Sequence, residues 1–204
     1  MQMEKLERHL ATESLLRPHE IRLLLQGKPI VDMPPWNDGA PYHAAVTFYK
    51  SLVAEVASRA HCTCETRYDE PSAEYSSYIE ALFFFKHRNF LLRSTPEFGE
   101  EYAALQVLMS RFSPYFSFME SSRVFTARGS SITILPELAM IDNLHHPEIT
   151  RLASQIQPLL EERGLIRAYR ENLQEPLESG LKVPTWLTDD GFYTQFDALF
   201  QLDD

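Results

Sequence analysis

The sequence predicts a single α+β domain over residues 1–204, in which a mixed or mainly antiparallel sheet of about four to six strands is covered by about three amphipathic helices. Three stretches with apolar residues at helical spacing predict these helices, at about 42–60, 97–112 and 147–163. Residues 62–68 alternate in the manner of a half-buried strand. With 44% hydrophobic residues, the chain has enough apolar surface to bury a core.

A small helical piece is expected first in the chain. Apolar residues recur at helical spacing between residues 3 and 10, and a second helix begins at Pro18, because proline suits a first helical turn. Residues 28–41 (KPIVDMPPWNDGAP) then form a proline-rich loop. The double proline does not fit a regular element, and Asn-Asp-Gly is typical of a turn.

The strongest helical pattern covers about residues 42–60. Its apolar side chains form one continuous stripe, and the polar residues lie mostly on the other face. Such a helix covers a sheet, and the period-two segment CTCETRY (62–68) follows it. Residues 74–85 fit either a buried strand or a helix, because a short apolar run satisfies both periods, and the choice stays open at this point.

The second half of the chain alternates between helical and extended patterns. Residues 97–112 follow a hydroxyl cap and a proline and carry acidic residues in the first turn, which predicts a helix. The stretches 123–127 and 131–135 flank a glycine-containing turn and predict a hairpin. The helix at 147–163 begins with proline and ends before a glycine.

Two further elements close the predicted fold. Residues 165–169 (LIRAY) are expected to form a strand, and residues 191–201 a last apolar element. Pro158 lies inside the 147–163 helix and is expected to kink it.

The charge balance is acidic, with 19 Lys and Arg against 29 Asp and Glu and a formal net charge of -10. An acidic surface repels phosphate backbones and anionic lipid and attracts basic proteins, so neither nucleic acid nor a membrane is expected as a partner. No apolar run approaches the roughly 20 residues of a spanning helix, and the N-terminus lacks a secretory pattern. The two cysteines lie too close together to join distant segments, and a cytoplasmic location is expected.

No compact catalytic signature is present, although catalytic residues scattered along the sequence would escape such a search. The one cluster of metal-ligand residue types contains His61, Cys62 and Cys64. A zinc site needs a second ligand pair, which the sequence lacks, so buried apolar cysteines are the favoured interpretation and no metal or cofactor is expected. For His145 and His146, the favoured interpretation is the start of a helix rather than catalysis.

Two charged regions are candidates for contact with a partner. Lys86, His87, Arg88 and Arg93 form a local basic group, which suits a solvated hairpin tip or a contact for an acidic partner region. The C-terminal quarter instead combines acidic residues with aromatic ones, and this pattern fits aromatic anchors inside an acidic rim as well as core packing. The candidate partner-binding residues are Trp36, Trp186, Asp189, Asp190, Phe192, Tyr193 and Asp197. For Trp36, packing on the core is the favoured interpretation and an interface anchor is the alternative.

The segment from about 147 to 204 has the order helix, Gly164, strand LIRAY, ENLQEPL and TQFDALFQLDD. It resembles the closing part of small acidic immunity proteins of bacterial polymorphic toxin systems. The resemblance implies a protein that binds and occludes a toxin without turnover, and it carries over no catalytic residue.

We therefore expect a protein-binding module, most concretely an immunity or antitoxin-type inhibitor of a basic effector. One alternative is a small-molecule enzyme with a pocket lined by His61, Cys62, Cys64 or His145. Another is a secretion chaperone that holds an unfolded client segment. The oligomeric state stays open.

Overall fold

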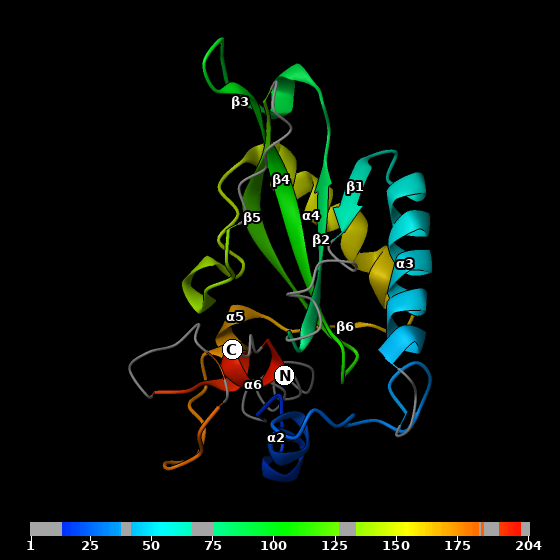
Figure 1. The fold of residues 1–204 in the computed structure, drawn as a ribbon, viewed down its shortest axis with the longest axis vertical. Helices are drawn as coiled ribbons and strands as arrows, with labels where there is room; N and C mark the ends of the chain where they lie inside the picture. The colour runs from blue at the N-terminus through cyan, green and yellow to red at the C-terminus, as the bar shows by residue number, and fades with distance from the viewer. Residues whose placement is uncertain are drawn as a thin grey trace, which may run out of the picture.

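A six-stranded sheet forms the centre of the computed structural model, which describes residues 14–37, 42–66, 76–126, 134–183, 185 and 192–200. The strand order is β1-β2-β4-β5-β6, and β3 pairs with the first residues of β4 (Figure 1). The pairs are antiparallel except for the parallel β5–β6 pair, so the predicted α+β fold with a mixed sheet is confirmed. The elements are α2 Pro18–Leu24, α3 Tyr42–Arg59, β1 Thr63–Thr66, β2 Tyr78–Phe84, η2 Arg88–Phe90, β3 Leu91–Thr95, β4 Gly99–Ser110, β5 Tyr115–Phe125, η3 Leu138–Met140, α4 Pro147–Glu161, β6 Ile166–Arg167, α5 Arg170–Leu173 and α6 Gln195–Leu199.

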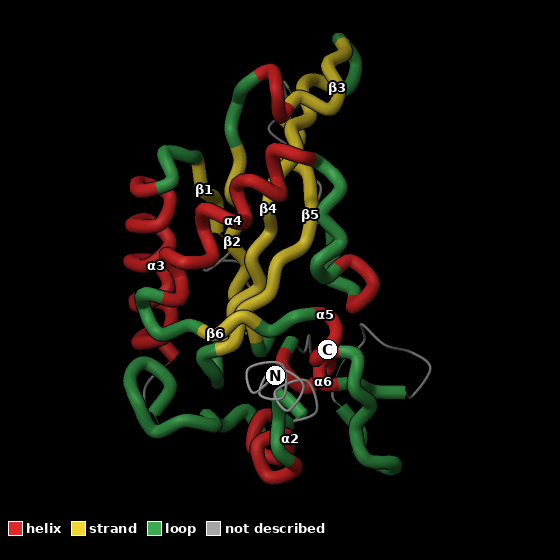
Figure 2. The backbone as a smooth tube through the Cα atoms, turned by 180° about the vertical axis from the view of Figure 1, so that it is seen from behind, coloured by secondary structure: helices red, strands yellow, loops and turns green. Residues whose placement is uncertain are grey.

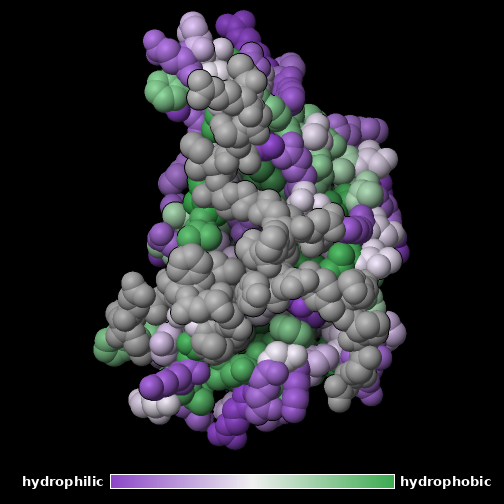
Figure 3. All heavy atoms as spheres, in the orientation of Figure 1, coloured by the Kyte–Doolittle hydropathy of each residue, from purple (hydrophilic) through white to green (hydrophobic). Residues whose placement is uncertain are grey.

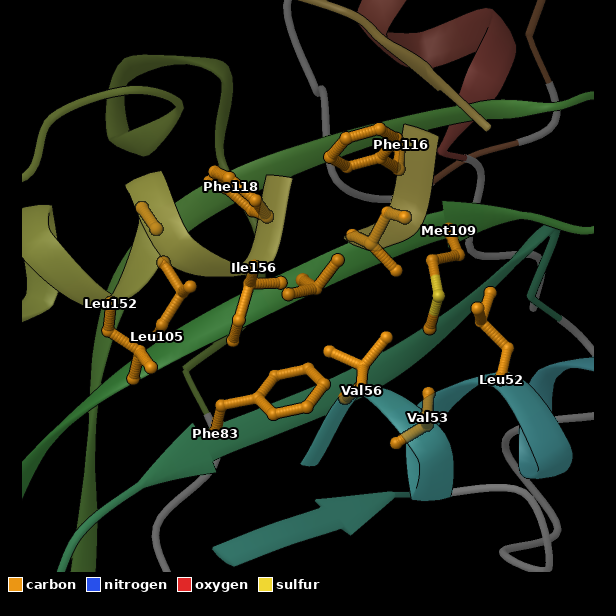
Figure 4. Packing of buried hydrophobic residues seen from close by; sticks show 14 of the residues in the cluster. Leu52, Val53, Val56, Phe83, Leu105, Met109, Phe116, Phe118, Leu152 and Ile156 are labelled. Atoms are coloured by element: carbon orange, nitrogen blue, oxygen red, sulfur yellow. The ribbon is translucent and has the colours of Figure 1, made fainter. Parts of the chain in front are cut away.

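The main core lies between one face of the sheet and the two long helices, α3 and α4 (Figure 2). Each helix packs its apolar stripe against alternate residues of β2, β4 and β5, because successive strand side chains point to opposite faces. Figure 4 shows how these side chains interdigitate: Leu52, Val53 and Val56 from α3, Leu152 and Ile156 from α4, and Phe83, Leu105, Met109, Phe116 and Phe118 from the sheet.

A second core covers part of the opposite face and joins the two ends of the chain. Leu108 and Met119 of the sheet pack there with Leu24 of α2 and with Phe196 and Phe200 at α6. Polar contacts fasten the same region: the Leu16 N–H donates to Gln195 Oε1 at 3.0 Å, and the Ser77 hydroxyl donates to the Leu199 carbonyl at 3.0 Å. In Figure 1, α2 and α6 accordingly lie together at one end of the sheet.

The predicted helix at 97–112 is wrong, because this segment forms the central strand β4, Gly99–Ser110. Leu105 and Val107 face the main core, while Ala104 and Leu108 on the other face are also fully buried. A strand buried on both faces has a continuous apolar run, which lacks the period-two signal that identifies a half-buried strand.

Other expectations near the sheet are resolved by the structure. The sequence of residues 74–85 fits either a strand or a helix, and the structure shows a strand, because Tyr78–Phe84 pairs with both β1 and β4. The first strand of the predicted 123–127 hairpin is the end of β5, whereas residues 127–133 lie outside the described residues. Of the predicted second strand at 131–135, the structure describes residues 134 and 135, and these two residues belong to no strand.

Most of the remaining elements match the sequence predictions, whereas the short helix α5 was not predicted. The helices starting at Pro18 and Pro147, the helix near 42–60 and the strand near 62–68 are confirmed as α2, α4, α3 and β1. The LIRAY strand shortens to two residues, and the last apolar element forms the short helix α6. The expected helix between residues 3 and 10 lies outside the described residues.

Candidate functional site

Trp36 lies in the core and not on the surface, with only 2% of its area exposed. Its indole N–H donates to the Tyr49 hydroxyl at 3.1 Å, and that hydroxyl donates to the Ser110 carbonyl at 2.5 Å. The indole also packs edge-on against Phe48, with 5.6 Å between ring centroids. The proline-rich loop is therefore fastened to α3 and β4, and Trp36 cannot act as a surface anchor in this fold.

The C-terminal candidates divide between surface and interior. Phe192 is 81% exposed, and Tyr193 is partly buried. Asp197 is only 3% exposed. Its carboxylate caps α6 and accepts hydrogen bonds from the Thr194 N–H at 2.7 Å and from the Thr194 hydroxyl at 2.9 Å. Its structural role removes it from a partner surface. Trp186, Asp189 and Asp190 lie outside the described residues.

Cys62 and Cys64 pack against the main core from the inner face of β1. Burial raises the pKa of the Cys62 thiol to about 11 and also raises the pKa of Cys64. Both thiols therefore stay protonated near neutral pH, whereas a metal ligand or nucleophile must be a thiolate. His61 is exposed at the turn after α3, with a φ of 53°. Within the described residues, no group of three or more His, Cys, Asp or Glu side chains is placed to hold a metal ion.

His145 and His146 start helix α4. Both backbone N–H groups donate to Glu120 Oε2, at 2.7 and 2.8 Å, which fixes the chain beside β5. His146 Nδ1 then accepts from the Glu148 N–H at 3.3 Å and caps the helix, while its ring stacks on Phe90 at 6.0 Å. The interpretation of this pair as a helix start is confirmed.

The basic group at 86–93 is spread over several partners. The Lys86 ammonium lies 3.6 Å from the centre of the Phe125 ring. Arg93 forms an ion pair with Glu101 at 3.2 Å and lies over the Phe98 ring at 4.9 Å. These contacts hold Lys86 to the end of β5 and Arg93 to the β3–β4 hairpin.

The β3–β4 hairpin projects from the body of the molecule (Figure 1) and presents two apolar side chains. Phe98 is 57% exposed and Leu92 is 49% exposed. The Phe98 N–H donates to Thr95 Oγ1 at 3.1 Å, so the turn is held by a hydrogen bond of its own. On the face in Figure 3, mostly hydrophilic residues surround this end of the molecule. The sequence does not reveal this surface, because the pattern at the tip predicts the start of a helix.

An open pocket of about 230 Å³ lies between η2 and the first half of α4. Phe85, Phe90 and Leu152 contribute its apolar lining, and the two phenyl rings are 4.9 Å apart. Its polar residues are His87, Glu148, Arg151 and Gln155. Only His87 among them was singled out from the sequence, because the pocket combines segments about 60 residues apart in the chain.

The buried Arg167 forms an ion pair with the partly buried Asp142 at the β5–β6 edge of the sheet. The guanidinium lies 3.8 Å from the centre of the Phe118 ring. Asp142 also accepts from the Arg170 N–H at 2.7 Å, and its φ of 60° turns the chain toward α5. The pair fixes the loop after η3 to β6.

No protein-family model matches this sequence, and neither a curated protein nor a solved structure matches it. No helix in the part of the chain that the structure describes is long and apolar enough to cross a membrane.

Proposed function

We propose that the protein is a cytoplasmic protein-binding module, an immunity-type inhibitor that occludes a basic effector or toxin domain. The observation that carries the proposal is the net charge of -10 combined with the use of arginines in ion pairs with acidic residues of the same chain. Arg59 pairs with Glu162 at 2.6 Å, and Arg123 pairs with Glu65 at 2.7 Å. Because each such pair is neutral, the acidic excess is carried by the remaining side chains and attracts a basic partner.

The projecting β3–β4 hairpin supplies an apolar contact for the same partner. Phe98 stands between the exposed Glu97 and Glu100, and Leu92 lies on the neighbouring strand. Aromatic side chains that enter a pocket of the partner dominate the energy of most interfaces. Charge attraction then brings the two proteins together, and the hairpin anchors the contact. Inhibition follows from occlusion, without turnover.

The alternatives receive less support from the described residues. An enzyme centred on Cys62 and Cys64 needs a thiolate, which burial disfavours at both positions. A secretion chaperone would bind an unfolded segment of its client, so an added client peptide would compete with the client for the binding site. An inhibitor binds only a folded domain, so such a peptide would not compete.

The test is a pull-down from the native source with tagged protein, at low and high salt, read by mass spectrometry. The proposal predicts one stoichiometric basic protein that is weakened at high salt. Phe98→Ser should weaken the complex about tenfold or more, which corresponds to about 1.4 kcal/mol. Leu135→Ser is the control, because Leu135 is an exposed apolar residue away from the hairpin.

Two outcomes would oppose the proposal. An empty pull-down at low salt would exclude a tight inhibitor under those conditions. A complex that survives both Phe98→Ser and Phe192→Ser would leave the described exposed phenylalanines without a role in binding.

A further inference from the structure

The projecting β3–β4 hairpin (Figure 1) carries a positive charge, Arg93, beside the apolar contact that the proposed partner meets. A positive charge at this place opposes the attraction of a basic protein. The side chain of Arg93 is 51% exposed, so it does not serve to fill the core. Its contacts within the hairpin therefore indicate its role.

Arg93 lies in the middle of a chain of contacts that runs from β5 to the hairpin turn. The Ser122 hydroxyl donates to Glu101 Oε1 at 2.7 Å, and Arg93 Nη2 donates to Glu101 Oε2 at 3.2 Å. The guanidinium carbon of Arg93 lies 4.9 Å from the centre of the Phe98 ring. Because Glu101 is itself held by β5, it places the guanidinium over the ring.

The orientation of the Phe98 ring depends on this contact. The backbone at Phe98 is already held, because its N–H donates to Thr95 Oγ1 at 3.1 Å. An exposed side chain on a fixed backbone still populates several rotamers. An exposed cation–π contact favours one of them by about two- to fivefold.

We infer that Arg93 is a positioning residue, which holds the Phe98 ring in the orientation that enters the partner. The inference rests on the proposed function, because it concerns the same hairpin contact. The guanidinium covers one face of the ring, so the partner receives the other face and the edge in an apolar slot, with basic residues opposite Glu97 and Glu100. A ring that is ordered in advance loses less rotamer freedom on binding, which slows dissociation.

Ring mobility in the free protein tests the positioning without a partner. In the full chain with carbon-13-labelled phenylalanine rings, NMR relaxation reports the picosecond-to-nanosecond order of the Phe98 ring. Arg93→Gln should make the ring more mobile, and Arg93→Lys should keep most of its order, because Lys86 makes the same kind of contact with Phe125. Arg88→Gln is the matched control, since Arg88 is an exposed arginine of η2, just before β3, and its loss should leave the ring unchanged. Equal ring order in Arg93→Gln and the unmodified chain would overturn the inference.

Dissociation from the partner captured at low salt tests the consequence for binding. Arg93→Gln and Arg88→Gln remove the same charge, so charge attraction alone predicts an equal or faster association in both variants. Positioning predicts a dissociation rate about two- to fivefold higher in Arg93→Gln only.

Two binding results would also overturn the inference. One is equal dissociation rates in the two glutamine variants. The other is faster dissociation of Arg93→Gln without a change in ring mobility, which would place Arg93 in direct contact with the partner. An empty pull-down at low salt would refute the proposed function, whereas the ring measurement in the free protein would still support or overturn the positioning of Phe98.

Discussion

Replacing Gly99 with alanine should loosen the β3–β4 hairpin, because there is no room for a methyl group at this position. Gly99 has a φ of 77° and begins β4. A Cβ built on it would lie 2.0 Å from the Phe125 carbonyl oxygen, whereas Cβ atoms essentially never come closer than 3.0 Å. The backbone of one strand must therefore move by about 1 Å, next to the paired residues Glu100 and Phe125.

The size of the effect has two parts. A positive φ costs an alanine roughly 1–2 kcal/mol relative to glycine. Displacement at the end of the β4–β5 ladder adds the loss of one or two hydrogen bonds, each worth about 0.5–1.5 kcal/mol. In a chain of this length, about 1 kcal/mol lowers the Tm by roughly 2–4 °C.

Gly164→Ala isolates the steric part. Gly164 has a φ of 84°, and nothing lies within 4 Å of a Cβ added there. Both variants carry the cost of a positive φ, so urea unfolding should show Gly99→Ala to be less stable than Gly164→Ala by about 1–3 kcal/mol. Equal losses in the two variants would refute the close approach of Gly99 to Phe125.

Three further perturbations test the interior. Arg167→Met should destabilise the protein by about 1.5–3 kcal/mol in urea unfolding, and adding Asp142→Asn should recover part of that loss, because the single change leaves the partly buried Asp142 carboxylate without its positively charged partner. Tyr49→Phe should cost about 1–3 kcal/mol, since its hydroxyl links Trp36 to the sheet, and a change below about 0.5 kcal/mol would contradict that link. The Cys62 thiol, with a pKa of about 11, should react slowly with iodoacetamide at pH 8 and faster as the pH rises toward 11, and fast reaction at pH 8 would contradict its burial.

The two long helices α3 and α4 were predictable from sequence because each buries only one face. In α4, Ile149, Leu152, Ala153 and Ile156 are buried against the sheet, whereas Thr150, Arg151, Ser154 and Gln155 are exposed, which produces a clear helical period. The strand β1 was predictable for the equivalent reason, since Cys62 and Cys64 face the core while Thr63 is exposed.

The central strand and the surface sites were not predictable in the same way. Both faces of β4 are buried, so its apolar run fits a helix as well as a strand. Burial of Trp36 depends on Tyr49, which sequence alone does not place beside it. The η2–α4 pocket likewise requires Phe90 and Glu148 to meet through the fold.

The salt dependence of association with a basic protein distinguishes an electrostatically steered inhibitor from other binding proteins. The protein captured in the pull-down is purified, and its binding rates are measured by biolayer interferometry at about 0.05 and 0.5 M salt. We expect a one-to-one complex whose association rate falls steeply with salt, and whose dissociation rate rises in Phe98→Ser. An association rate that is unchanged by salt, in a complex indifferent to Phe98, would contradict this expectation.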